Sequence, residues 1–284
     1  AVFLPGLAPK PAPVAEAPAA PIVNPYAEAN ATIEAKAAIV YDLVTGEILY
    51  QRNAQAQLPL ASLTKLLTVY AGATALGTGS SITVTERSLR PEGDSGFHAG
   101  DEFAFTELAK AALVASSNDA AEAIAEAAEN RRAVSADTLM RSAAAAAGLS
   151  ETYAVNGTGL DVNESISGGY GSAEDIALLA GALFKKVESI VRATTEPTVS
   201  VQSLAGQTYT FKNTNPVVEE IPGLMLSKTG YTDLAGGNLA VVFDASINHP
   251  IAVVVLGSSV DGRFTDVQAL IRATLTSFVR LPTP

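Results

Sequence analysis

The order of strand-like and helix-like patterns along the chain constrains the fold more than any other feature. β-Branched and aromatic residues on both sides of Thr45-Gly46 predict a hairpin near the start of the folded part. A long Ala- and Leu-rich stretch with helical periodicity follows, and GLMLSK, NLAVVFDA and PIAVVVLGS then predict three buried strands. Strands at both ends of the chain with helices between them predict a mixed sheet built from both ends, with the helical part inserted.

Within the middle and last parts of the chain, several helices and one further hairpin are expected. The segment after Pro59 predicts a helix that begins near Ser62. Ser172 followed by Asp175 indicates a capping box at the start of another helix. The expected helices are about 62–76, 106–129 with a polar break near Ser116-Ser117, 134–147, 173–186 and 262–278, and TVSVQ with QTYTF forms the hairpin.

The first residues differ in composition from the rest of the chain. Seven of the 15 Pro residues fall in the Ala/Pro-rich segment before residue 35. Such a segment predicts an extended, semi-rigid linker over residues 1–34, and a disordered tail is the alternative. A single folded domain is then expected over residues 35–281, with its helical subdomain at about 62–190. The chain contains no apolar run of about 18 residues, so no membrane span is expected, and an anchor segment would lie upstream.

Composition excludes several classes of function. The chain has no Cys and two His, which excludes thiolate nucleophiles, Cys-ligated zinc and iron–sulfur clusters, and no cofactor or metal is expected. A formal net charge of −11 disfavours nucleic acid and anionic lipid as partners, because Lys and Arg supply most of the affinity for phosphate.

Ser62 and Lys65 are the first candidate reactive pair. An i, i+3 spacing places the hydroxyl and the amine on the same face of a helix. A Ser hydroxyl is a weak nucleophile until a base takes its proton, and a Lys amine becomes that base when burial lowers its pKa. A pair with this spacing is common by chance, so alone it equally fits a solvent-facing Ser and Lys.

Two further motifs follow in order. Ser116-Ser117-Asn118 lies at the predicted break between helices, and Lys228-Thr229-Gly230 ends a predicted strand. In a chain of this composition, all three motifs in this order are expected by chance about 0.004 times. The ordered set is therefore specific although its first two members are not.

This set resembles the signature of the penicillin-recognising serine enzymes, which include the penicillin-binding proteins and the serine β-lactamases. The resemblance extends from about Ala37 to Phe278 and is closest to the low-molecular-mass D-alanyl-D-alanine carboxypeptidases. It implies an α+β fold of the β-lactamase/transpeptidase type, with a mainly antiparallel five-stranded sheet flanked by helices. The matching stretches are IVYDLVTGEILYQRNA, PLASLTKLLT, ALVASSNDAAEAIAE, NGTGL, SAEDIALL, NTNP, SKTGYTDLAGG and VVVLGSSVDGRF.

The resemblance also implies catalytic roles. Ser62 would attack the carbonyl between two terminal D-Ala residues and become acylated, while Lys65 takes its proton. Ser116 would relay a proton to the leaving amine, and Lys228 would maintain the electrostatic environment of Ser116. Asn118 would hydrogen-bond the substrate backbone and Lys65.

The same resemblance implies the binding groups. The backbone N–H groups of Ser62 and Tyr231 would form the oxyanion hole. Thr229 and Arg263 match positions that bind the terminal carboxylate, although Arg263 could instead be a surface residue that starts the last helix. Gly230 lets the substrate backbone approach the strand, which a Cβ would obstruct.

The resemblance implies a bacterial extracytoplasmic enzyme whose partners are a peptidoglycan stem peptide and inhibitory β-lactams. A D,D-endopeptidase and a β-lactamase-like hydrolase are alternatives, and a catalytically silent wall-binding module is a third. A β-lactamase would carry a Glu-x-x-Leu-Asn segment between the second and third motifs, and neither Glu151 nor Glu164 fits that pattern.

Overall fold

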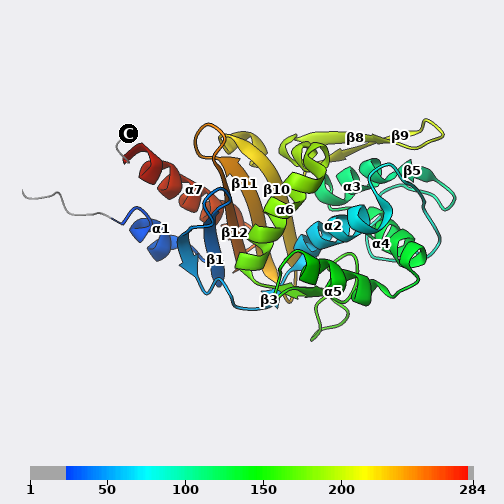
Figure 1. Cartoon of the computed structure of the whole chain (residues 1–284), viewed down its shortest axis with the longest axis horizontal. Helices are drawn as coiled ribbons and strands as arrows, with labels where there is room; N and C mark the ends of the chain where they lie inside the picture. Colours follow the sequence, from blue (N-terminus) through cyan, green and yellow to red (C-terminus); the bar gives the residue numbers. More distant parts are fainter. Residues whose placement is uncertain (1–23, 281–284) are drawn as a thin grey trace, which may run out of the picture.

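The computed structural model describes residues 24–280, and its centre is a single sheet built from both ends of the chain (Figure 1). Its strands are β1 (Ala37–Asp42), β2 (Ile48–Arg52), β10 (Leu224–Thr232), β11 (Gly236–Asp244) and β12 (Pro250–Ser258). They lie in the order β10-β11-β12-β1-β2, and all four pairs are antiparallel. The prediction of a mainly antiparallel five-stranded sheet is confirmed. The prediction of a mixed sheet is wrong, because β1 runs opposite to β12 where the two chain ends meet.

Both faces of this sheet are buried, which explains the continuous apolar runs in its strands. In β12, Ile251, Val253 and Val255 pack with one hydrophobic cluster, and the alternating residues pack with the other. The first cluster includes residues of α1 (Ala27–Thr32) and α7 (Gly262–Arg280), whereas α6 (Ala173–Arg192) covers the opposite face (Figure 1). The sheet is therefore the middle layer between helices.

The helical subdomain is inserted between β2 and β10. Its helices are α2 (Thr64–Leu76), α3 (Phe105–Val114), α4 (Asn118–Arg132) and α5 (Ala136–Ala146), with α6 connecting it to the sheet. Short strands form three small sheets beside these helices. In one, β7 (Gly169–Gly171) pairs with both β3 (Leu58–Pro59) and β6 (Tyr153–Ala154). The other two are β4 (Ser81–Thr83) with β5 (Glu102–Ala104), and β8 (Thr198–Gln202) with β9 (Thr208–Lys212). Among these, the sequence predicted only the β8–β9 hairpin.

The predicted linker differs in part from the structure. Residues 1–23 of it lie outside the described residues, and residues 24–34 are folded rather than extended. Tyr26 and Ile33 are buried, and the Tyr26 hydroxyl is 3.1 Å from Thr274 Oγ1 of α7. This segment is therefore part of the outer helical layer of the sheet, because it contributes buried apolar side chains to that layer. The many Pro residues before it made the whole segment resemble a linker in the sequence.

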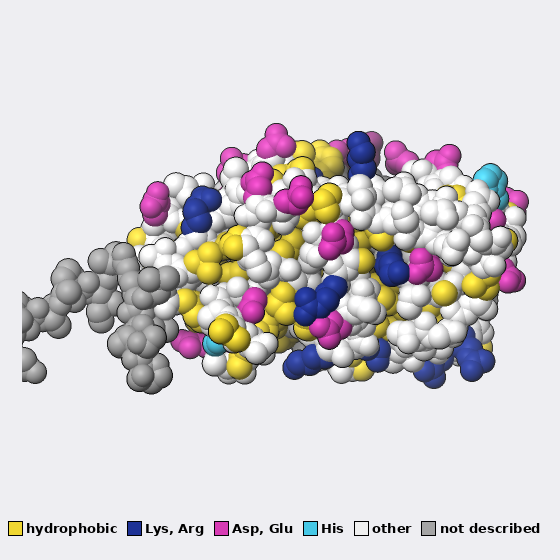
Figure 2. Space-filling model, turned by 90° about the horizontal axis from the view of Figure 1, so that it is seen from above, with side chains coloured by type: hydrophobic (Ala, Val, Ile, Leu, Met, Phe, Trp, Pro, Cys, Tyr) yellow, Lys and Arg dark blue, Asp and Glu magenta, His cyan; other side chains and the backbone are white. Residues whose placement is uncertain are grey.

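On the face shown in Figure 2, acidic and basic side chains are interspersed with apolar ones. None of the helices between residues 24 and 280 combines the length and the apolar character that a membrane crossing requires.

Candidate active site

Ser62 and Lys65 lie at the junction of a short 3-10 turn, η1 (Ala61–Leu63), with α2. Lys65 Nζ is 2.8 Å from Ser62 Oγ, as the i, i+3 spacing predicts. The Lys65 side chain is fully buried, and this burial lowers its pKa to about 7. A large fraction of the amine is therefore neutral at neutral pH, in the form that accepts a proton.

Lys65 has a second partner that the sequence analysis did not identify. Its Nζ donates a hydrogen bond of 2.7 Å to the carbonyl oxygen of Thr158. The loop that supplies this carbonyl is closed by Asn156, whose Oδ1 accepts from the backbone N–H groups of Thr158 and Gly159 at 3.1 and 2.8 Å. The segment NGTGL thus directs a backbone carbonyl at the candidate base, and its Asn-x-x-Gly turn chemistry is the only local signal for it.

The loop also packs closely against η1. Gly159 has a φ of +80°, and a Cβ at this position would collide with the carbonyl oxygen of Ala61. Thr68 of α2 donates from its hydroxyl to Gly157 O at 2.6 Å. The turn η1 and the loop are therefore held together by contacts on both sides of Lys65.

Ser116 and Lys228 form a second hydroxyl–amine pair. Ser116 lies between α3 and α4 with a φ of +58°, which turns the chain sharply at the predicted break. Lys228 Nζ donates to Ser116 Oγ at 3.0 Å and to Thr229 O at 2.8 Å. Burial, with the nearby charges of Lys65 and Arg263, holds the pKa of Lys228 well below its usual range. The structure therefore brings the first, second and third motifs together, from segments distant in the sequence.

Asn118 is the first residue of α4, but its expected contact with Lys65 is absent within residues 24–280. Instead its Nδ2 donates to Glu92 O at 2.5 Å, and its Oδ1 is buried without a hydrogen-bond partner. Ser117, the residue before it, caps α4 by accepting from Ala120 N at 3.0 Å. An unpaired buried acceptor is costly, so this amide oxygen is suited to receive a donor from a ligand.

The third motif lies on β10, the edge strand of the sheet, beside η1. A Cβ added to Gly230 would lie 2.9 Å from Leu60 O and 3.2 Å from Ser62 N. Gly is therefore required here by the close approach of η1, in addition to the predicted approach of a substrate. Tyr231 is 49% exposed. The group of this residue that the resemblance places in the site is its backbone N–H, not its ring.

Thr229 is buried, and its hydroxyl is 2.6 Å from the hydroxyl of Thr214. Thr214 belongs to the NTNP segment, and its backbone N–H donates to Val114 O at 3.1 Å, two residues before Ser116. The segment therefore connects the second motif to the third. The sequence analysis gave Thr214 no role, because it shares no local pattern with either motif.

Arg263 extends from the first turn of α7 toward β10. Its Nη1 donates to Gly230 O at 2.7 Å, while its Nε is buried without a hydrogen-bond partner. Burial lowers its pKa from the usual value, and the nearby Asp261 partly opposes that shift. The residue is half-buried beside the third motif rather than on the open surface.

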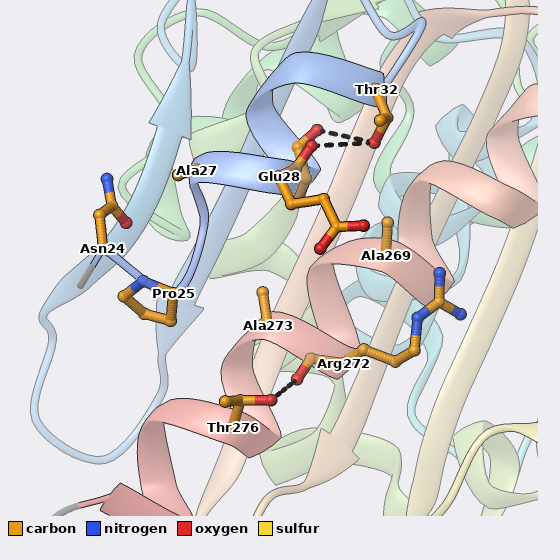
Figure 3. Close-up of a pocket in the computed structure, with 10 residues that line it drawn as sticks. Asn24, Pro25, Ala27, Glu28, Thr32, Ala269, Arg272, Ala273 and Thr276 are labelled. Carbon is orange, nitrogen blue, oxygen red and sulfur yellow. Dashed lines mark hydrogen bonds between the residues drawn. The ribbon is translucent and has the colours of Figure 1, made fainter.

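A separate hollow of about 420 Å³ lies between α1 and α7, on the face of the sheet opposite to α6 (Figure 3). Ala side chains line much of it, together with Glu28 and Arg272. None of its lining residues belongs to the three motifs, and it contains no hydroxyl–amine pair. The candidate chemistry therefore resides at the junction of η1, α4 and β10.

Comparison with known proteins agrees with this geometry. Bacillus subtilis D-alanyl-D-alanine carboxypeptidase DacF is 32% identical over 231 residues, which cover 75% of this chain and 58% of DacF. A Pseudomonas aeruginosa D-alanyl-D-alanine endopeptidase is 30% identical over 234 residues, which cover 80% of this chain and 72% of that protein. The chain thus spans about three fifths of the length of DacF.

A protein of known structure and a known protein family also match this chain. Penicillin-binding protein D2 from Listeria monocytogenes, in its ampicillin-bound form, superposes with a TM-score of 0.72 at 27% identity, covering 86% of this chain and 98% of that one. The pattern of the family described as D-alanyl-D-alanine carboxypeptidase matches residues 24–260. This chain therefore belongs to the D-alanyl-D-alanine carboxypeptidase family, Peptidase_S11.

Proposed function

We propose that this chain is a serine D-alanyl-D-alanine carboxypeptidase that removes the terminal D-Ala of peptidoglycan stem peptides. The observation that carries the proposal is the Ser62–Lys65 pair at 2.8 Å, with a buried amine whose pKa is about 7. Membership of the family supplies the reaction class, because its relatives carry carboxypeptidase and endopeptidase names.

Acylation begins at Ser62. Its Oγ attacks the carbonyl carbon of the penultimate D-Ala while its proton passes to the neutral amine of Lys65. The backbone N–H groups of Ser62 and Tyr231 bind the oxygen that becomes negatively charged. The C–N bond then breaks: Ser116 gives its proton to the leaving amine of the terminal D-Ala and takes up the proton that Lys65 holds, and Lys228 stabilises the charges around Ser116.

Hydrolysis of the acyl-enzyme completes the cycle. Water attacks the ester carbonyl, Ser62 recovers its proton, and the peptide leaves with one D-Ala fewer. Asn118 accepts a hydrogen bond from the substrate backbone through its unpaired Oδ1, and Thr229 with Arg263 binds the terminal carboxylate.

β-Lactams are the proposed inhibitors, because they acylate the same nucleophile and neither Glu151 nor Glu164 is placed to hydrolyse the adduct quickly. Glu164 is exposed in a turn, and the backbone N–H of Glu151 donates to Asp175 away from the motifs. The ampicillin-bound Listeria relative supports this choice. The proposed location is outside the cytoplasmic membrane of a bacterium, where peptidoglycan lies, and an N-terminal anchor is part of this proposal.

The experiment compares two substrates. Purified protein is incubated with a pentapeptide that ends in D-Ala-D-Ala, and separately with a cross-linked stem-peptide dimer. Release of D-Ala from the pentapeptide, abolished by Ser62→Ala, is the expected result. The endopeptidase relative from Pseudomonas aeruginosa favours a second candidate, and cleavage of the dimer alone would establish it.

A further inference from the structure

The guanidinium of Arg263 is held by two contacts with the protein. Its Nη1 donates to Gly230 O at 2.7 Å, and its Cζ lies 4.7 Å from the centre of the Phe264 ring. These two contacts fix the plane of the group between the start of α7 and β10.

The carbonyl that Arg263 binds belongs to the same peptide unit as the N–H of Tyr231. Because a trans peptide is planar, its C=O and N–H point in opposite directions, so fixing the oxygen also fixes the direction of the N–H. A charged donor on the carbonyl also polarises the unit and strengthens the N–H as a donor. Arg263 therefore acts on Tyr231 N–H without touching it.

The same residue also lies against the turn that carries Ser62. A Cβ on Gly230 would be 3.2 Å from Ser62 N, so β10 passes directly against the backbone that supplies the proposed first oxyanion donor. Arg263 binds the same residue through Gly230 O. The contacts at Gly230 thus fix the position of the second donor relative to the first.

We infer that Arg263 is a positioning residue of the oxyanion hole, in addition to its proposed contact with the substrate carboxylate. Its Nη1 orients the Gly230–Tyr231 peptide, and the edge that carries the unpaired Nε remains for the substrate. This inference rests on the proposed acyl-enzyme function.

The test separates the two roles by removing the carboxylate from the ligand. The rate of Ser62 acylation is measured by mass spectrometry with a penicillin and with its methyl ester. Wild type is compared with Arg263→Ala and Arg263→Lys. Arg272→Ala, on the exposed side of the same helix, is the matched control.

Loss of an oxyanion donor lowers rates about 10²–10³-fold, so misorientation in Arg263→Ala is expected to slow acylation by the ester roughly tenfold or more. Arg263→Lys retains a cationic donor and is expected to restore most of the ester rate. Arg272→Ala is expected to match wild type. An ester rate unchanged in Arg263→Ala overturns the inference while leaving the acyl-enzyme function standing. Failure of both compounds to acylate wild type overturns both.

Discussion

Two buried lysines dominate the chemistry at the scale of single residues. Lys65 and Lys228 are both removed from solvent, which disfavours their charged forms. Among the residues that the structure describes, Lys65 has no carboxylate partner; it donates to Ser62 Oγ and to the Thr158 carbonyl. A buried amine without a counter-charge costs stability, and a base that must be neutral at neutral pH benefits from that arrangement.

The pH dependence of acylation follows from this burial. Because the pKa of Lys65 is lowered to about 7, its neutral form increases as the pH rises through 7. We expect the acylation rate to climb about tenfold per pH unit well below pH 7 and to level off above about pH 8. Penicillin labelling rates between pH 5 and pH 9 measure this. A profile that is flat or falls across neutrality would show that Lys65 is not the base.

Thr214 provides a second prediction at this scale. Its hydroxyl is 2.6 Å from that of Thr229, so Thr214→Val removes a partner that orients the Thr229 hydroxyl toward a carboxylate. One hydrogen bond contributes about 0.5–1.5 kcal/mol, so KM for a D-Ala-D-Ala peptide should rise roughly 2–10-fold with little change in kcat. Thr210→Val is the control, because that hydroxyl pairs with Ser200 on the exposed β8–β9 hairpin. Equal KM changes in both variants would contradict the role.

The motif residues could be predicted from the sequence, but their supporting contacts could not. Ser62 and Lys65 are close because helical geometry alone relates residues i and i+3. The Thr158 carbonyl reaches Lys65 from 93 positions away, and a backbone carbonyl leaves no mark on residue type. Within residues 24–280 the expected Asn118–Lys65 contact is absent: Asn118 Nδ2 donates to Glu92 O, and Asn118 Oδ1, the atom that could accept from the Lys65 amine, has no partner.

At the scale of elements, the contact between η1 and β10 sets the geometry of the site. The strand passes so close to the 3-10 turn that only Gly fits at position 230, although nothing in its φ requires Gly. The edge position of β10 allows this contact, since its outer side has no neighbouring strand in the sheet. Changes at this contact should therefore act on the nucleophile and the oxyanion hole together.

Gly230→Ala tests this contact. The added methyl would lie 2.9 Å from Leu60 O and 3.2 Å from Ser62 N, so either η1 or β10 must shift. We expect acylation by penicillin to slow at least about tenfold, because the oxyanion donors lose their alignment. Gly79→Ala is the control, since a Cβ there meets no atom within 4 Å. Wild-type acylation by Gly230→Ala would show that the contact does not position the site.

Long elements were predictable, whereas short ones were not. The helix expected at 134–147 is Ala136–Ala146, and the one expected at 173–186 begins at Ala173 with Ser172 accepting from Asp175 N. The carboxylate of Asp175 does not complete the capping box, because it binds the Glu151 N–H and the Thr152 hydroxyl instead. Strands of two or three residues, such as β3, are too short to show an alternating pattern.

At the scale of the whole molecule, the sheet unites the two ends of the chain. β1 from the start pairs with β12 near the end, so the helical insertion is closed at its base by strand pairing. The segment before β1 continues this closure on the outer face, where Tyr26 stacks on Tyr50 with ring centres 5.3 Å apart. Composition pointed to a linker here because Pro and Ala dominate the preceding residues.

Ile33→Ala tests whether this segment belongs to the folded domain. Ile33 is 7% exposed, and truncating a buried Ile costs about 2–5 kcal/mol of unfolding free energy. Ile247→Ala is the matched control, because Ile247 is 91% exposed and should change stability by less than about 0.5 kcal/mol. Denaturant unfolding measures both. Equal stabilities of the two variants would mean that residues 24–34 do not contribute to the domain.

The proposed function depends on acylation of Ser62, which mass spectrometry after exposure to penicillin measures. We expect a single covalent adduct on the peptide that contains Ser62, persisting over a time course, and no adduct in Ser62→Ala. An adduct on another residue, or equal labelling of Ser62→Ala, would contradict it.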